Sequence, residues 1–237
     1  MAINYFLIML RNDIRNIFRD KMLVIFCFMP LIMIMVMRFL LPVAEAYFPV
    51  IVDYKLYILA AVCLVSIIGP ALLSSMIMLD EKDENLFVVL NIMPLSPGMF
   101  IFFRLVFITL LAFFASWITM LFSGIERVNI LSSFLLSVQA GLIAPVIALF
   151  CVSFARNKIE GVTLLKGLNF FSVIPLVLIF SETTWEWVGA IIPFYWVYKA
   201  FAAMAFPGEM ILYVMGGVLV NFGFIYWLYR RFFYKKA

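Results

Sequence analysis

Segment 80–98 is the part of the chain whose residue types could dock on another protein. It reads DEKDENLFVVLNIMPLSPG, so acids precede an apolar stretch that predicts a short helix over Leu86–Ile92. Acids stabilise the start of a helix, and leucines one turn apart can enter a single groove of a partner. A proline ends such a helix near the preceding residue. The candidate docking residues are Glu81, Asp83, Glu84, Leu86, Leu90 and Pro94. An interfacial loop without a partner is the alternative.

The chain offers little that could catalyse a reaction or bind a metal. It has no His, which removes the commonest general base and metal ligand, and Cys27, Cys63 and Cys151 lie in separate apolar runs, so zinc-type spacing is absent. Its serines have no base to activate them. No G-x-x-x-x-G-K-[ST] sequence occurs, so the chain has no P-loop for ATP. We therefore expect no enzyme activity, metal or cofactor in this chain, with ATP and Mg²⁺ bound, if used, by a separate subunit.

The composition of the chain indicates that segment 80–98 lies between membrane-spanning helices. Of 237 residues, 67% are hydrophobic and only 13% are charged, which predicts an all-α integral membrane protein forming one domain over 1–237. The basic excess is typical of membrane orientation, and we expect no nucleic acid partner. Runs long enough to cross a bilayer as helices are Met22–Leu41, Leu56–Leu79, Phe103–Ser123, Ile130–Phe154, Val162–Phe180 and Met210–Tyr229.

The basic residues predict the orientation of these six spans. With the N-terminus inside, thirteen of the 17 Lys and Arg residues lie on the cytoplasmic side, as the positive-inside rule favours. Both termini are then cytoplasmic in the plasma membrane. This orientation requires Trp185–Phe206, which is broken by Pro193, to form a re-entrant or interfacial helical pair on the outer side.

Residues 3–20 predict an interfacial helix. Apolar residues recur there at helical spacing, and basic and amide residues fill the other side. The basic residues are Arg11, Arg15 and Arg19. The helix could be a simple anchor or a mechanical element, and the pattern does not separate these two roles.

Two further patterns concern the packing of the spans. Ser133, Ser137 and Gly141 repeat every four residues, which lets helix backbones approach closely. Prolines within four spans predict kinks. They are Pro30, Pro70, Pro145 and Pro175.

The distribution of acids bears on the energy source. All thirteen lie in predicted loops or at span ends, whereas ion-coupled pumps usually hold carboxylates inside the membrane. Backbone carbonyls could still bind sodium, so an ion-coupled or passive transporter stays an alternative. A membrane-embedded accessory or immunity protein is the third.

The order of these parts resembles the permease subunits of ABC exporters of the second type. The resemblance is carried by the basic helix leading into the first span (Arg11–Pro30), by the Pro193-Phe194-Tyr195 sequence before the last span, and by the acidic segment. In that segment the matching positions are Glu81, Lys82, Asp83, Glu84, Leu86, Leu90, Pro94, Leu95 and Ser96. Many relatives have Gly-Thr after the acids, where this chain has Asn85. The segment looks most similar to the branch of drug or fluoroquinolone exporters, and export of amphipathic peptides is equally compatible.

The resemblance implies a partnership and a path. It implies a separate P-loop ATPase subunit, a second permease chain (identical or different), and a translocation path between them lined by the second and fifth spans. The candidate path residues are Ser66, Pro70, Ser74, Asn169, Phe170 and Phe171. Phe-rich walls with a few hydroxyls suit hydrophobic or amphipathic cargo, although most phenylalanines of a span simply face lipid or pack.

Overall fold

A computed structural model describes Arg11, Arg15, Phe18 and residues 21–84, 97–125, 128–180 and 186–234. Every regular element in these ranges is a helix, which confirms the all-α expectation. Within the described residues, six stretches are long and apolar enough to cross a membrane, so the chain is a multi-pass membrane protein. They are Met29–Tyr47, Pro49–Asp83, Gly98–Phe122, Ile130–Phe154, Lys158–Phe180 and Pro207–Phe233.

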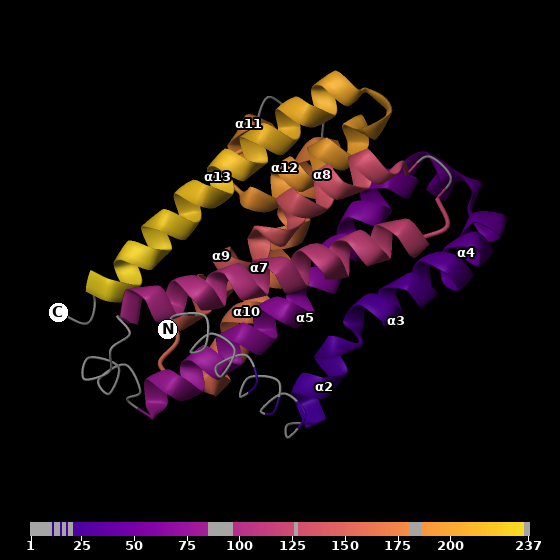
Figure 1. Cartoon of the computed structure of the whole chain (residues 1–237). Coiled ribbons are helices and arrows are strands. Elements are labelled where there is room, and N and C mark those ends of the chain that lie inside the picture. The colour runs from indigo at the N-terminus through magenta and orange to yellow at the C-terminus, as the bar shows by residue number, and fades with distance from the viewer. Residues whose placement is uncertain are drawn as a thin grey trace.

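The long helices run side by side as one bundle (Figure 1). The end of α5, the start of α7 and the end of α13 lie at its left in that view, and we call this the Asp83 end. The end of α7 and the start of α8 lie at the opposite end, which we call the Lys55 end. The principal helices are α5 (Lys55–Asp83), α7 (Pro97–Phe122), α8 (Ile130–Gly141), α9 (Ile143–Phe154), α10 (Lys158–Phe180) and α13 (Pro207–Tyr234).

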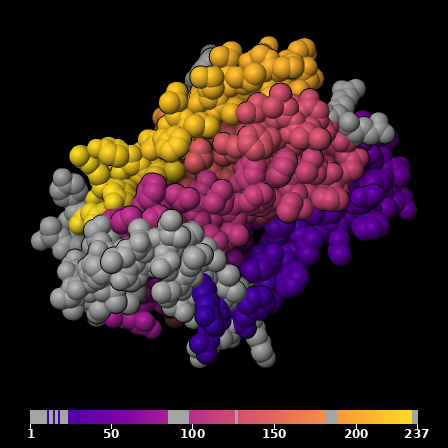
Figure 2. Space-filling model, viewed as in Figure 1, coloured from indigo at the N-terminus to yellow at the C-terminus, as the bar shows by residue number. Residues whose placement is uncertain are grey.

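Helix α5 forms the centre of the bundle. Its residues are apolar on all sides, as expected for a helix surrounded by others, and most positions between Leu59 and Leu79 are buried. It packs against α7, α9, α10 and the short helix α12 (Pro193–Ala202). The space-filling view shows the N-terminal helices and α13 at opposite edges of one face, with α7 and α8 between them (Figure 2).

The first span is divided by prolines, and its stretch long enough to cross a membrane is Met29–Tyr47, whereas the predicted span is Met22–Leu41. Helix α2 (Lys21–Cys27) ends before Pro30, which lies in the first turn of α3 (Met29–Met35). A proline inside a helix has no N–H to donate, and its ring clashes with the carbonyl group four residues earlier. A π-helical turn, η1 (Val36–Leu40), precedes Pro42 in α4 (Leu41–Tyr47). A short 3₁₀ helix, η2 (Pro49–Tyr54), connects α4 to α5.

The first span and α5 approach each other closely where the Phe26 carbonyl faces Gly69. Pro30 has no N–H for this carbonyl, and a methyl group placed on Gly69 of α5 would overlap its oxygen. Because Gly69 has no side chain, the two backbones can come into contact at this position.

The predicted small-residue packing of the fourth span is confirmed, and one proline breaks the span. A Cβ on Gly141 would come within 3.0 Å of the backbone nitrogen of Phe113 in α7, so α7 and α8 approach closely there. Ser133 accepts a 3.1 Å hydrogen bond from the Trp117 indole. The helix breaks between α8 and α9, because the ring of Pro145 would clash with the Gly141 carbonyl in a continuous helix and Pro145 has no N–H to donate to it. Pro70 and Pro175, by contrast, lie within the unbroken helices α5 and α10.

Residues 186–205 form short elements before the last span. These are α11 (Glu186–Gly189), α12 and the 3₁₀ turn η4 (Ala203–Ala205), as the predicted helical pair requires. Trp196 of α12 donates a 2.7 Å hydrogen bond to the Ala190 carbonyl. Its side chain lies against Gly216 and Gly217 of α13, where any Cβ would overlap it. Helix α12 is therefore held against α13.

The predicted interfacial helix falls mostly outside the described residues. Arg11, Arg15 and Phe18 are helical and exposed, as a surface helix requires. Arg19 and the rest of 3–20 lie outside them.

Candidate functional site

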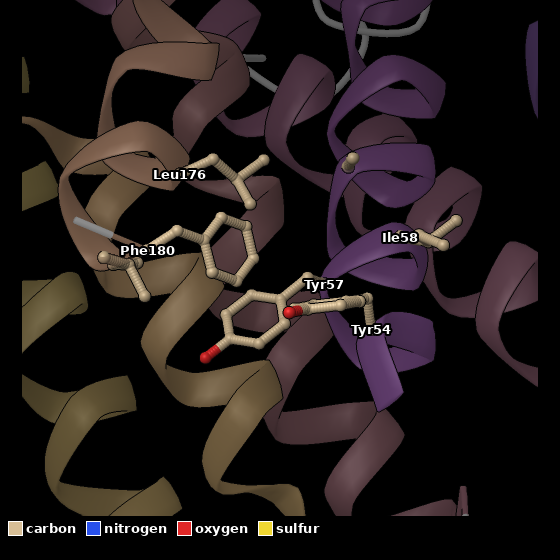
Figure 3. Close-up of a pocket in the computed structure, with 7 residues that line it drawn as sticks. Tyr54, Tyr57, Ile58, Leu176 and Phe180 are labelled. Atoms are coloured by element: carbon tan, nitrogen blue, oxygen red, sulfur yellow. The ribbon is translucent and has the colours of Figure 1, made fainter. Parts of the chain in front are cut away.

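A cavity of about 600 Å³ opens between α5 and α10 at the Lys55 end (Figure 3). This volume lies within the range of drug-sized binding sites, which are mostly apolar with a few polar groups. Two tyrosine hydroxyls are the side-chain polar groups among its lining residues. These are Tyr54, Tyr57, Ile58, Ala61, Leu176, Ile179 and Phe180.

Three aromatic rings line the cavity. Phe180, the last residue of α10, reaches towards Tyr54, the last residue of η2, and Tyr57 of α5 (Figure 3). Its ring centroid lies 5.2 Å from that of Tyr54 and 5.0 Å from that of Tyr57, both in edge-to-face geometry. Phe180 is still 46% exposed, so a flat apolar molecule can reach the rings without first displacing a buried side chain.

The predicted path residues of α5 are buried within the bundle. Ser66 donates to the Val62 carbonyl and accepts a 3.1 Å hydrogen bond from the Thr119 hydroxyl of α7. Pro70 and Ser74 border a cavity of only about 20 Å³ between α5 and α7, which suffices for a water molecule but not for cargo. Within this chain, none of the three lines the large cavity.

The predicted path residues of α10 lie on its exposed side. Asn169, Phe170 and Phe171 are all exposed, and Phe170 is 73% exposed. The structure therefore does not bring them together with Ser66, Pro70 and Ser74 in one cavity of this chain. That both sets line a path between two chains stays a prediction.

The acids of segment 80–98 lie elsewhere than expected. The sequence predicts them at the start of a cytoplasmic helix, but α5 continues through Asp83, with Glu84 as its C-cap. Acids are unfavourable at a helix C-terminus, and basic partners offset this cost. Glu81 pairs with Arg104 of α7, and Asp80 lies 2.7 Å from the Lys158 ammonium of α10. Asp83 and Glu84 are exposed, and Leu86, Leu90 and Pro94 lie outside the described residues.

Sequence reasoning missed two sets of residues. The cavity uses Tyr54, Tyr57 and Phe180, whose position at the ends of predicted spans is the one signal that could have pointed to them. Arg104 is one of the thirteen basic residues that the positive-inside pattern assigns to the cytoplasmic side, yet only 2% of its side chain is exposed. A charge inside an apolar run is a functional candidate by default. Among the described residues, no three His, Cys, Asp or Glu side chains group as metal ligands would.

Comparison with known proteins places the chain in a family. A family model described as "Fluoroquinolones export permease protein Rv2686c-like" matches residues 13–229. Fluoroquinolones export permease protein Rv2686c of Mycobacterium tuberculosis (strain ATCC 25618 / H37Rv) is 30% identical over 235 residues, covering 96% of this chain and 93% of the relative. Fluoroquinolones export permease protein MT2760 of strain CDC 1551 / Oshkosh matches with the same identity and coverage. The chain therefore belongs to the Rv2686c-like family of fluoroquinolones export permease proteins.

Proposed function

We propose that this chain is the membrane-spanning subunit of an ATP-driven exporter that moves flat, amphipathic aromatic drugs of the fluoroquinolone class out of the cell. The observation that carries the proposal is the aromatic cavity between α5 and α10. Its three rings suit a planar aromatic molecule, and its tyrosine hydroxyls can hydrogen-bond polar substituents. The printed names of the relatives support the same class of cargo.

ATP hydrolysis belongs to a separate subunit in this proposal, because the sequence has no P-loop. The Asp83 end is the cytoplasmic side of the plasma membrane, so both termini are cytoplasmic and the aromatic cavity lies towards the outer side. Asp83 and Glu84 are exposed at that end and can pair with basic residues of an ATPase. ATP and Mg²⁺ bind to that partner and not to this chain.

A second permease chain covers α10 in this proposal. Lys166 and Asn169 are exposed on this helix within a predicted span, where lipid would leave their polar groups without hydrogen-bond partners. Packing against a second permease chain relieves that cost, and it places Phe170 and Phe171 beside the space between the chains. The partner is either a copy of this chain or a related one.

The test is to purify the tagged chain from its native membranes in mild detergent and identify what accompanies it. We expect a P-loop ATPase. In reconstituted vesicles, ATP should then drive uptake of a fluorescent fluoroquinolone, whereas a non-hydrolysable ATP analogue should not. Transport that a protonophore abolishes and that ATP does not drive would contradict the proposal and favour an ion-coupled transporter.

A cavity variant connects this transport to the site. Phe180→Ala removes one ring of the aromatic cluster, and an aromatic pair contributes about 0.5–1.5 kcal/mol. We therefore expect the apparent affinity for the drug to fall about two- to tenfold. Phe222→Ala is the matched control, because Phe222 is a similarly exposed phenylalanine on α13 that does not line the cavity. Equal transport by both variants would place the binding site elsewhere.

A further inference from the structure

Three consecutive residues in the last turn of α5 contact three different helices. Asp80 pairs with Lys158 at the start of α10, Glu81 pairs with Arg104 of α7, and Lys82 donates to carbonyls at the end of α9. Successive helical residues point about 100° apart, so one rigid turn reaches in three directions. Segment 84–96, which holds most of the predicted docking residues, follows immediately.

The pair between Glu81 and Arg104 is the most buried of these contacts. Only 15% of the Glu81 side chain and 2% of the Arg104 side chain are exposed, and the Arg104 guanidinium also lies 5.1 Å from the centre of the Phe100 ring. A buried charge that loses its partner is strongly unfavourable. The pair therefore fixes the end of α5 to the start of α7, and these are the two helices that segment 84–96 connects.

Lys82 caps α9. Its ammonium donates hydrogen bonds of 3.0 Å to the Val152 carbonyl and 2.8 Å to the Ala155 carbonyl. The last carbonyls of a helix have no partners within the helix, and the negative end of the helix dipole favours a cation there. Arg231 of α13 adds a second cation at the same place, 4.2 Å from the centre of the Phe154 ring.

The contact with α10 depends on packing more than on charge. Asp80 and Lys158 are 45% and 43% exposed, and a pair this exposed contributes little to stability. Beneath it, Leu79 lies directly against Gly161 of α10, where a Cβ would meet the leucine methyl group. Movement of α5 at this level therefore pushes on α10, which lines the aromatic cavity.

We infer that Asp80, Glu81 and Lys82 form a transmission joint that passes displacement of the last turn of α5 simultaneously to α7, α9 and α10. These are positioning residues, since they act through the helices that they hold. The inference rests on the proposed function, because the displacement originates in a docked ATPase. It assigns Glu81 and Lys82 to contacts within the chain, and leaves Asp83 and Glu84 as the acids that face a partner.

The test compares basal with drug-stimulated ATPase rates in the purified, reconstituted complex. Lys82→Met removes the ammonium but keeps the length of the side chain, and Lys82→Arg restores a cation. Glu81→Arg combined with Arg104→Glu exchanges the charges of the buried pair, which protects against loss of folding by an unpaired arginine. Glu45→Gln is the matched control, because it breaks the 2.9 Å pair between Glu45 and Lys55 at the opposite end of α5.

We expect Lys82→Met to keep its basal ATPase rate while drug stimulation falls at least about fivefold, the lower range of coupling between distant sites. Lys82→Arg and the charge exchange should recover most of the stimulation, and Glu45→Gln should not change it. Normal stimulation in Lys82→Met would overturn the joint while leaving the proposed function intact. If the wild-type complex shows no drug stimulation at all, the proposed function fails and the joint with it.

Discussion

Replacing Gly69 by alanine should separate α5 from the first span. A Cβ at this position would overlap the carbonyl oxygen of Phe26 and lie 3.4 Å from the Met29 Cβ. The obstacle is a backbone atom, so a rotamer change cannot relieve the overlap. One of the two helices must shift.

The expected size of the effect follows from two opposing contributions. Overpacking of this kind costs about 1–3 kcal/mol, whereas alanine is favoured over glycine within a helix by about 1 kcal/mol. Gly223→Ala on α13 carries only the second contribution, because a Cβ there has no neighbour within 4 Å. The difference between the two alanine variants therefore isolates the overlap, at about 1–3 kcal/mol.

Thermal unfolding in one detergent measures this difference. For a chain of this length, 1 kcal/mol corresponds to a shift of about 2–4 °C in Tm. Gly69→Ala should therefore unfold about 2–12 °C below Gly223→Ala. Equal Tm values for the two variants would show that Phe26 and Gly69 do not approach each other as described.

Two other predictions concern topology and docking. Single cysteines near Lys158 and Lys235 should be labelled from the cytoplasm, and single cysteines near Glu45, Arg127 and Glu186 should be labelled from outside. Labelling from outside at position 235 together with labelling from inside at position 158 would show that Trp185–Phe206 crosses the membrane. Leu86→Asp and Leu90→Asp should leave insertion and expression unchanged but cause loss of ATPase binding or of cargo-stimulated turnover, because a docked carboxylate would be desolvated without a partner. If both variants assemble and export normally, the basic helix around Arg11–Arg19 becomes the next candidate for docking.

The sequence predicted the spans well because membrane thickness imposes a length on each apolar run. Helix ends were predicted less well, since some helices continue beyond the apolar run into charged residues. Helix α5 extends from the predicted Leu79 to Asp83, and the basic partners Arg104 and Lys158 come from distant parts of the chain. Local composition carries no information about such partners.

The aromatic cavity could not be predicted for a related reason. Tyr57 and Phe180 belong to spans two and five, which the resemblance had already associated with a path. Which faces of these helices meet depends on the packing of the whole bundle, and the predicted hydroxyl residues of α5 lie away from this cavity. Ser66 uses its hydroxyl to bind the neighbouring Thr119, as buried polar groups in a bundle usually do.

The contact of Trp196 with Gly216 and Gly217 has a consequence for biogenesis. Helix α12 has 10 residues and so reaches about 15 Å, half the thickness of the hydrocarbon core. The insertion machinery cannot integrate it as an independent span. The two glycines that accommodate Trp196 are present only after α13 has been synthesised and inserted. Packing of Trp196 is therefore completed only after insertion of α13, and a nascent chain that stops short of Gly216 leaves α12 packed against α5 but without its contact with the last helix.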